Sequence, residues 1–248
     1  MFSKIRKICG EVRNKWTSTD IKEFSRVLWV LEIIFFVLQY FCVSTWICGT
    51  REEHNANYTL ARSQRRSLKV EKYLLCFFVL EVASIFVINL PSNKLLQILQ
   101  TIFLWIVIYR ILTIFIVIIN MNIFDILRLK GLKHRMISSI RTVVLSFWNY
   151  LELMLCFGIC YDYFSNNGLS KQLKFLDPYY FSVITQLTIG YGDIHPVRNW
   201  VKILVIFQGI LGFIFAVFII ARIVSFLPRI GSLYEDNNKL TVKKDGKE

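Results

Sequence analysis

The sequence lacks the short motifs that mark the common enzyme classes. It contains no HExxH pair, no phosphate-binding glycine loop, no nucleophile–base pair and no dinucleotide fingerprint. Its six cysteines form no CxxC pair and are scattered, mostly within apolar runs. We therefore interpret them as small buried hydrophobic residues rather than as metal or redox groups. These absences predict a protein that is not an enzyme and that needs no cofactor.

Acidic residues are also scarce. The chain has 17 Asp and Glu against 30 Lys and Arg, which gives a net charge of +13. It is 55% hydrophobic and its mean hydropathy is +0.49, more than the surface of a soluble protein tolerates. Because the basic residues cluster between apolar runs, they suit a membrane surface better than a nucleic acid. The sequence indicates an all-α membrane protein whose partner is the lipid bilayer, and no nucleic acid.

Long apolar runs predict six membrane-spanning helices. They lie at about residues 27–48, 73–90, 95–109, 111–127, 143–163 and 201–227. The third and fourth come from a single run, which as one helix would rise about 50 Å, too long for one crossing. We therefore predict a hairpin that turns near Tyr109 to Leu112, in preference to one long helix.

The distribution of positive charge predicts the orientation. Basic residues are concentrated in the N-terminal segment 1–26, the amphipathic linker 128–141 and the tail 228–248. We expect all three to be cytoplasmic, with the protein in the plasma membrane and an even number of crossings. The basic loop 50–72 would then lie outside, where Asn57-Tyr58-Thr59 forms a glycosylation sequon.

A short polar interruption, Leu187 to Asp193, lies between the last two apolar runs. The preceding Asp177-Pro178 predicts an N-cap and the first turn of a short helix, 178–187, that enters the membrane and stops partway. Irregular backbone at membrane depth is tolerated only where it is buried in protein or lines a water-filled path. The interruption is therefore predicted to be a re-entrant loop that lines a pore.

The polarity of the predicted short helix favours a cation at the membrane centre, because the C-terminal end of a helix carries a partial negative charge. Gly190 and Gly192 permit backbone conformations in which successive carbonyl groups point the same way, and the Thr188 hydroxyl adds a further oxygen. Rings of such oxygens replace the water shell of an ion. One chain cannot enclose the path, so we predict a homotetramer.

Thr188-Ile189-Gly190-Tyr191-Gly192-Asp193 resembles the selectivity filter of potassium channels, with Ile189 in place of the commoner valine. We call residues 188–193 the filter segment. The resemblance implies that Thr188, Ile189, Gly190 and Tyr191 bind K⁺, the permeant ion, through backbone carbonyls, and that Gly192 and Asp193 form the outer mouth. The chain would then divide into a four-helix domain, 27–127, and a pore domain, 142–227.

The same resemblance assigns supporting residues on the helix before the filter segment. Tyr180 and Phe181 would brace Tyr191, and the Tyr180 hydroxyl would donate to Asp193. Ile184 replaces an acid that some family members use to hold the filter through its aspartate.

Further roles are implied after the filter segment. Gly212 would be the hinge of the last helix, and Ile220 and Val224 would line the inner mouth, the alternative being that they face lipid. His195 would face the outer vestibule, where four histidines could make conductance sensitive to protons; the alternative is an ordinary solvated residue.

The N-terminal half resembles voltage-gated potassium channels through Phe78, Glu81, the Pro91-Ser92 turn and Lys130-Gly131-Leu132. The arginine repeat of that family is missing. The positions that follow Arg110 in steps of three hold Thr113, Ile116, Ile119, Asn122 and Asp125. Since steep gating needs several charges per subunit, we predict weak or no voltage dependence.

The sequence leaves three alternatives open. The chain could be a potassium-selective channel subunit, a weakly selective cation channel, or a non-conducting regulatory subunit of a heteromeric channel. The intact Gly190-Tyr191-Gly192 favours the first. Arg110 is expected to pair with Glu81 in a structural role.

Overall fold

The computed structural model describes residues 26–39, 41–43, 47, 60–91, 93–124, 139–170 and 174–224. Helices account for nearly all of this part of the chain, and no strand is present in it. In chain order the elements are α2 (Arg26–Gln39), α5 (Leu60–Ile88), α6 (Lys94–Ile119), the π-helical turn η1 (Asn120–Phe124), α8 (Ser139–Gly168), α9 (Asp177–Gln186) and α10 (Asn199–Val224).

Some predicted features lie outside the described residues. These are the N-terminal segment up to residue 25, the sequon at Asn57, Asp125, most of the linker 128–141, and the tail 228–248.

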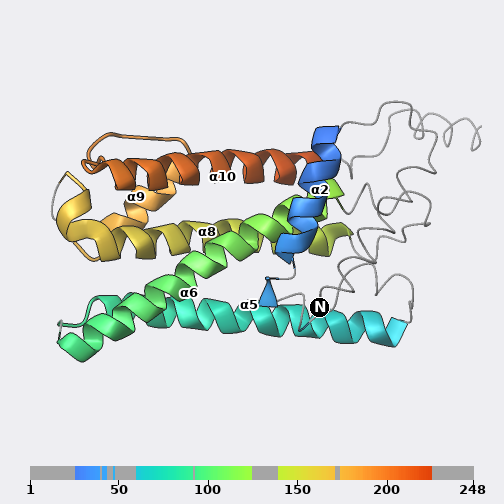
Figure 1. The fold of residues 1–248 in the computed structure, drawn as a ribbon, viewed down its shortest axis with the longest axis horizontal. Coiled ribbons are helices and arrows are strands. Elements are labelled where there is room, and N and C mark those ends of the chain that lie inside the picture. Colours follow the sequence, from blue (N-terminus) through green and yellow to red (C-terminus); the bar gives the residue numbers. More distant parts are fainter. Residues whose placement is uncertain are drawn as a thin grey trace, which may run out of the picture.

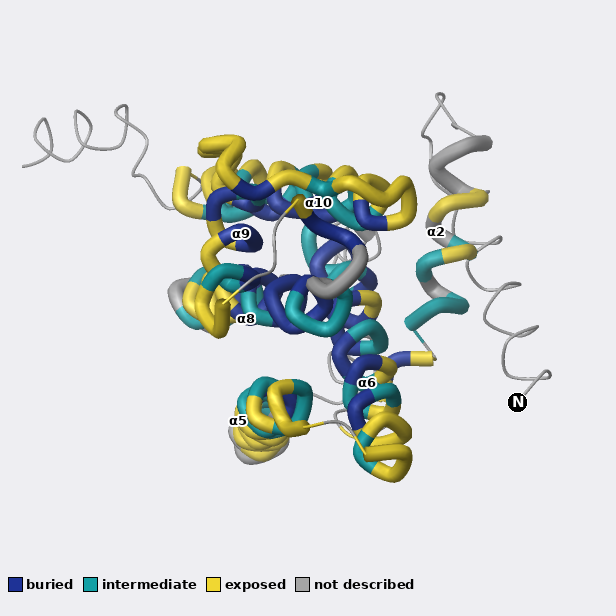
Figure 2. Tube along the Cα trace, turned by 90° about the vertical axis from the view of Figure 1, so that its left-hand side faces the viewer, coloured by how far each residue is buried: buried dark blue, intermediate teal, exposed yellow. Residues whose placement is uncertain are grey.

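The helices form a bundle around α8. In Figure 1, α5, α8 and α10 run along the long axis, α6 crosses it diagonally, and the short α9 lies between α8 and α10 near one end. Figure 2, an end-on view, shows the most deeply buried trace where α8, α9 and α10 meet. Leu153, Phe157 and Tyr161 of α8 are each 0% exposed. The long apolar sequence of α8 is thus explained by its central position.

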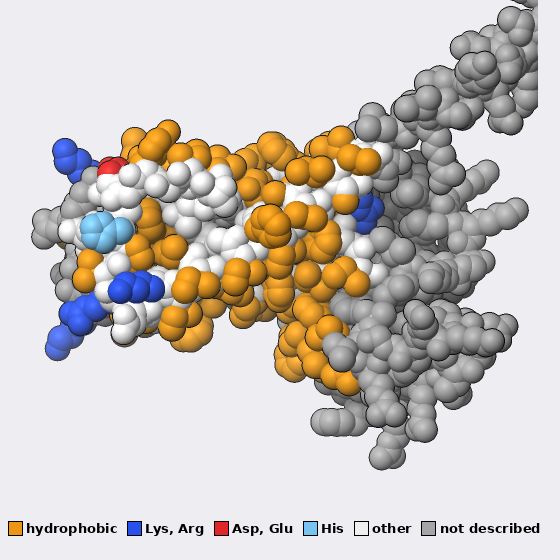
Figure 3. All heavy atoms as spheres, turned by 90° about the horizontal axis from the view of Figure 1, so that it is seen from above, with side chains coloured by type: hydrophobic (Ala, Val, Ile, Leu, Met, Phe, Trp, Pro, Cys, Tyr) orange, Lys and Arg blue, Asp and Glu red, His pale blue; other side chains and the backbone are white. Residues whose placement is uncertain are grey.

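Three helices of the described residues are long and apolar enough to cross a membrane: Lys94–Ile123, Val143–Phe164 and Asn199–Val224. Figure 3 shows hydrophobic side chains over the middle of one face and charged side chains near its ends. This distribution fits a multi-pass membrane protein. Six spans were predicted, and the structure differs from the predicted arrangement at three places.

The first departure is the predicted hairpin between 95 and 127. The structure has one continuous helix, α6, from Lys94 to Ile119, so the prediction of a turn near Tyr109 to Leu112 is wrong. Two physical reasons account for this. The segment contains no glycine or proline to break a helix, and α6 ends at Ile119, so it is shorter than the full run that was too long for one crossing.

The second departure concerns the basic loop 50–72. Residues 60–72 form the first half of α5, and Arg141 at the start of α8 donates to the Ser67 carbonyl at 2.9 Å and pairs with Glu71 at 2.9 Å. Residues 60–72 therefore lie at the same end of the bundle as the start of α8, and the prediction that these two regions lie on opposite sides is wrong.

The third departure is the predicted first span, 27–48. Helix α2 ends at Gln39, and Phe41 and Cys42 are not helical. The Tyr109 hydroxyl on α6 donates to the Phe41 carbonyl at 3.2 Å and accepts from the Val43 amide at 2.8 Å. These contacts satisfy backbone groups that a continuous helix would otherwise pair internally.

Candidate ion-conducting site

The site is built on α9, the short helix predicted after Asp177-Pro178. It runs from Asp177 to Gln186, with Pro178 in the first turn, where its missing N–H costs nothing. Asp177 is not the N-cap as predicted; Leu176 occupies that position, and the Asp177 carboxylate accepts from the Lys174 amide at 3.0 Å. An acid in the first turn still complements the helix dipole.

A buried polar network fastens α9 to the helices on both sides of it. Gln208 of α10 donates to the Ser182 carbonyl at 2.9 Å and to its hydroxyl at 2.8 Å, and it accepts from the Tyr161 hydroxyl of α8 at 2.7 Å. Gln208 and Gln186 also bond to each other, at 3.2 Å. Because the Gln208 side chain is 0% exposed and uses both its donor and its acceptor, it holds α8, α9 and α10 in one arrangement.

This network was missed at the sequence level. The available signal was a glutamine inside the stretch 203–221, which is otherwise free of polar side chains. Its partners come from residues 22 to 47 positions away along the chain, so no local pattern reveals them.

Glycines allow close approach at two helix contacts. A Cβ at Gly212 would lie 2.8 Å from Gln186 Cγ and 3.0 Å from the Gln186 carbonyl oxygen, so α10 touches the end of α9 here. Helix α10 is continuous through Gly212, which was predicted as a hinge, and the structure assigns this glycine a packing role. A Cβ at Gly158 would lie 2.5 Å from the Tyr179 ring, so α8 and α9 also meet closely.

The filter segment begins as an extension of α9. The amides of Ile189 and Gly190 both donate to the Ile184 carbonyl, at 2.9 and 3.3 Å, and the Thr188 amide donates to Thr185 at 3.1 Å. These bonds attach the start of the segment to the last turn of the helix.

The backbone of the filter segment alternates in handedness. Thr188, Gly190 and Gly192 have positive φ angles of 58°, 58° and 79°, whereas the residues between them do not. Positive φ is ordinary for glycine but strained for a β-branched threonine. Such strained backbone persists only where its surroundings enforce it and is found preferentially at functional sites.

All six residues of the filter segment are exposed in the single chain. The Tyr191 ring is 70% exposed, and Phe181, one of its two predicted braces, packs instead against Tyr161 at a centroid distance of 4.9 Å. The Tyr180 hydroxyl lies 3.5 Å from Asp193 Oδ1, at the outer limit of a hydrogen bond. In a single chain, no other part of the described structure buries the filter segment.

The loop after the filter segment is tied to the end of α8. His195 is exposed, but its backbone N–H donates to Ser170 Oγ at 3.2 Å and its carbonyl accepts from the Ser170 amide at 2.9 Å. Phe164 and Trp200 pack edge to face at 4.5 Å. These contacts fix the backbone around His195 and leave its side chain at the surface.

Polar side chains also join α5, α8 and α9 near this end. Asp162 accepts from Asn89 at 2.8 Å and from the Tyr179 hydroxyl at 3.4 Å. Asp162 therefore links α9 to α8 and to the end of α5.

One face of α10 is a continuous exposed apolar stripe. Its residues are between 45% and 67% exposed and follow a three–four spacing: Ile203, Ile206, Ile210, Phe213, Val217, Ile220 and Val224. In the most apolar 18-residue stretch of α10, 22% is buried, compared with 50% and 56% in the corresponding stretches of the other two membrane-capable helices. Ile220 and Val224 therefore belong to the face that one chain leaves uncovered.

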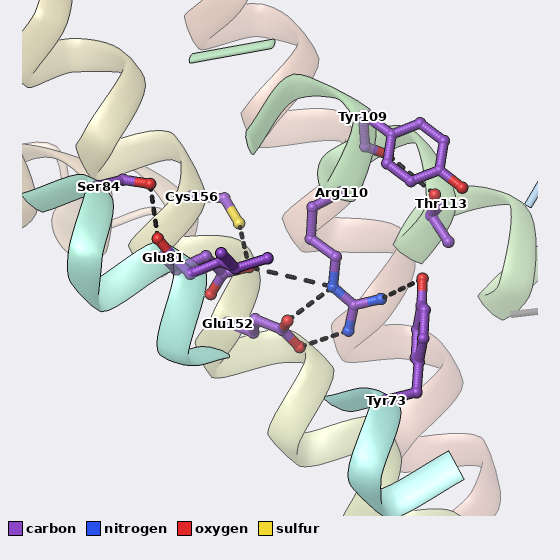
Figure 4. Close-up of polar contacts among 9 residues, drawn as sticks. Tyr73, Glu81, Ser84, Tyr109, Arg110, Thr113, Glu152 and Cys156 are labelled. Carbon is purple, nitrogen blue, oxygen red and sulfur yellow. Dashed lines mark hydrogen bonds and ion pairs between the residues drawn. The ribbon is translucent and has the colours of Figure 1, made fainter. Parts of the chain in front are cut away.

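A second buried cluster surrounds Arg110, as Figure 4 shows. The guanidinium makes a bidentate pair with Glu152 of α8, at 2.6 and 2.8 Å, whereas the nearest Glu81 oxygen is 4.0 Å away. The predicted partner, Glu81, is thus the more distant of the two acids, and Glu81 accepts from the Cys156 thiol at 3.2 Å instead. The arginine also lies over the Tyr73 ring, 5.3 Å from its centroid.

Comparison with known proteins gives two matches. Residues 149–229, about a third of the chain, match the family described as ion channel. The chain is also 37% identical over 98 residues to two-pore potassium channel 4 of Arabidopsis thaliana, a match that covers 36% of this chain and 34% of the plant protein. The chain thus aligns with about a third of the length of that relative. No solved structure gave a significant match.

The matched residues 149–229 include α9, the filter segment and the Gln208 network. The family match points to an ion channel, and the relative that aligns with this chain is a potassium channel.

Proposed function

We propose that the chain is one subunit of a tetrameric, potassium-selective channel of the plasma membrane, with its termini in the cytoplasm. The observation that carries this proposal is the alternating handedness at Thr188, Gly190 and Gly192, on a segment attached to the end of α9 and exposed. Backbone of this kind supports rings of carbonyl oxygens when four copies meet around an axis. K⁺ is the permeant ion, and no cofactor is required.

The polarity of α9 supports the same proposal. Its C-terminal end, at Gln186, precedes the filter segment directly, and the carbonyl end of a helix carries a partial negative charge. Four such ends aimed at one axis favour a cation there.

The decisive experiment is ion flux through purified protein in liposomes. We expect K⁺ efflux, little Na⁺ flux, and a reversal potential that follows the K⁺ gradient when Na⁺ replaces K⁺. Comparable Na⁺ flux would favour the weakly selective channel, and absence of flux would favour the regulatory subunit.

Gly190→Ala provides a matched filter variant. A Cβ at Gly190 meets nothing within 4 Å in the chain, so the substitution acts through the positive φ of 58° rather than through a clash within the chain. We expect it to abolish selective K⁺ flux while the protein still folds. Gly209→Ala, whose Cβ also meets nothing within 4 Å, serves as the control at a residue without positive φ.

A further inference from the structure

The inner end of α10 is attached to the end of α6 through Arg222. Its Nε donates to Asn122 Oδ1 at 2.9 Å, and its Nη2 donates to the Met121 carbonyl at 3.1 Å. Both acceptors belong to η1, the π-helical turn that follows α6. Hydrogen bonds from a guanidinium are charge-assisted and directional, so two of them restrain the orientation of the helix that carries it.

The acceptor side of this contact is held in place by α6 itself. Asn122 Nδ2 donates to the Ile118 carbonyl at 2.8 Å, which leaves Oδ1 turned toward Arg222. The neighbouring Asn120 donates to the Ile116 carbonyl at 3.0 Å and to the Phe35 carbonyl of α2 at 3.3 Å. Short π-helical turns inside α-helices occur frequently at functional sites.

Helix geometry relates this contact to the predicted inner mouth. Residues advance by about 100° around an α-helix, so Ile220 and Val224 both lie about 160° from Arg222 on α10. They are 61% and 56% exposed, on the face turned away from the Arg222 contact. The rotation of the helix at Arg222 therefore decides where these two side chains point.

We infer that Arg222 is a positioning residue: its two bonds to η1 set the rotation of the inner end of α10 and thereby aim Ile220 and Val224 at the conduction path. That Ile220 and Val224 line a conduction path rests on the proposed function. The rotation itself is a property of the chain and is testable without any current.

A simpler explanation is that Arg222 contributes only positive charge at a cytoplasmic helix end. Lysine would then serve equally well, because it keeps the charge near the helix C-terminus. Lysine is a point charge without the planar fork of arginine, so it does not reproduce both directed bonds. The two explanations therefore predict different outcomes for Arg222→Lys.

The experiment uses single-cysteine reporters in the full-length protein, reconstituted in lipid. Val224→Cys and, about 100° around α10 from it, Ile223→Cys are each treated with a water-soluble thiol reagent. Labelling of the peptide that contains the reporter is measured by mass spectrometry, so that the native cysteines do not interfere. The ratio of the two rates reports rotation, whereas general loosening raises both rates together.

We expect Arg222→Gln, Arg222→Lys and Asn122→Ala each to change this ratio by about tenfold, the scale of losing hydrogen bonds to a charged group. Asn122→Asp loses the donor to the Ile118 carbonyl but keeps an acceptor for the guanidinium, so it should change the ratio less than Asn122→Ala does. A ratio that is unchanged in Arg222→Gln, or preserved in Arg222→Lys, would overturn the inference. Absence of K⁺ flux from the unsubstituted protein would count against the proposed function alone, because the rate ratio is measured independently of flux.

Discussion

Thr188 shows at the scale of one residue how the site stores strain. Its φ of 58° is unfavourable for a β-branched side chain and costs on the order of 1–3 kcal/mol. The bonds from Thr188 and Ile189 to the last turn of α9, and the buried network behind that helix, keep it in this conformation. The filter segment therefore depends on residues that do not line it.

Gly212→Ala should loosen the support of the filter segment. The new Cβ would lie 2.8 Å from Gln186 Cγ and 3.0 Å from the Gln186 carbonyl oxygen, and backbone cannot move away cheaply. Overpacking of this kind costs about 1–3 kcal/mol. We expect a lower thermal midpoint in detergent and reduced K⁺ flux. Gly209→Ala has open space around its Cβ and should lose neither property; equal losses in both variants would contradict the packing role of Gly212.

The Gln208 network should behave as one unit. Gln208→Leu leaves the fully buried Tyr161 hydroxyl without its acceptor, which costs about 1–3 kcal/mol. Tyr161→Phe removes that hydroxyl, so Gln208→Leu should be less harmful in the Tyr161→Phe background than alone. A double-mutant cycle on thermal stability measures the coupling, and strictly additive effects would show that the bond does not contribute.

At the scale of elements, α6 is attached to the rest of the bundle along its length. Arg110 pairs with Glu152 of α8 near its middle, Thr101 lies 3.2 Å from the Tyr163 hydroxyl of α8, and η1 binds Arg222 of α10. Contacts at three positions along α6 hold the helix in place relative to α8 and α10. This arrangement differs from that of a helix that must slide to sense voltage.

Removing the partner of Arg110 should destabilise the bundle. Glu152→Gln leaves a buried charge without its bidentate partner, which costs about 3–5 kcal/mol. Glu81→Gln should cost clearly less, because the closest Glu81 oxygen is 4.0 Å from the arginine. Thermal unfolding in detergent measures both. The reverse order of effects would identify Glu81 as the true partner, as the sequence had suggested.

At the scale of the whole molecule, the exposed stripe of α10 and the uncovered filter segment both indicate an assembly larger than one chain. If the proposed tetramer forms through this stripe, Phe213→Asn should reduce the tetramer fraction, because Phe213, 66% exposed, lies in its middle. Ile98→Asn is the control, since Ile98 on α6 is 64% exposed but outside the stripe. Mass photometry in detergent gives the oligomeric state. An unchanged tetramer fraction in Phe213→Asn would exclude the stripe from the interface.

The conductance of the assembled protein should depend weakly on voltage. Each charge that crosses the membrane field contributes about 2.3 kcal/mol per 100 mV, and Arg110, the one basic residue in the middle of α6, is held by Glu152. We expect a shallow conductance–voltage relation in planar bilayers. A steep relation from this protein alone would require moving charges elsewhere in the chain.

Local chemistry allowed the sequence to determine several features of this protein. Composition indicated a membrane protein, Asp177-Pro178 marked the start of α9, and the glycines at 190 and 192 occur where the backbone has positive φ. Each of these depends on neighbouring residues only, so it is visible in a short stretch of sequence.

The tertiary structure decided what depends on distant partners. The run 95–127 was predicted as a hairpin because of its length, yet α6 is one helix that ends at Ile119, and Glu152, 42 residues from Arg110, pairs with that arginine inside the bundle. Residues 60–72 lie at the same end of the bundle as the start of α8, because Arg141 of α8 pairs with Glu71. The close approach at Gly212 and the Gln208 network arise in the same way, because the groups that satisfy a buried polar or close-packed position meet only when the helices have assembled.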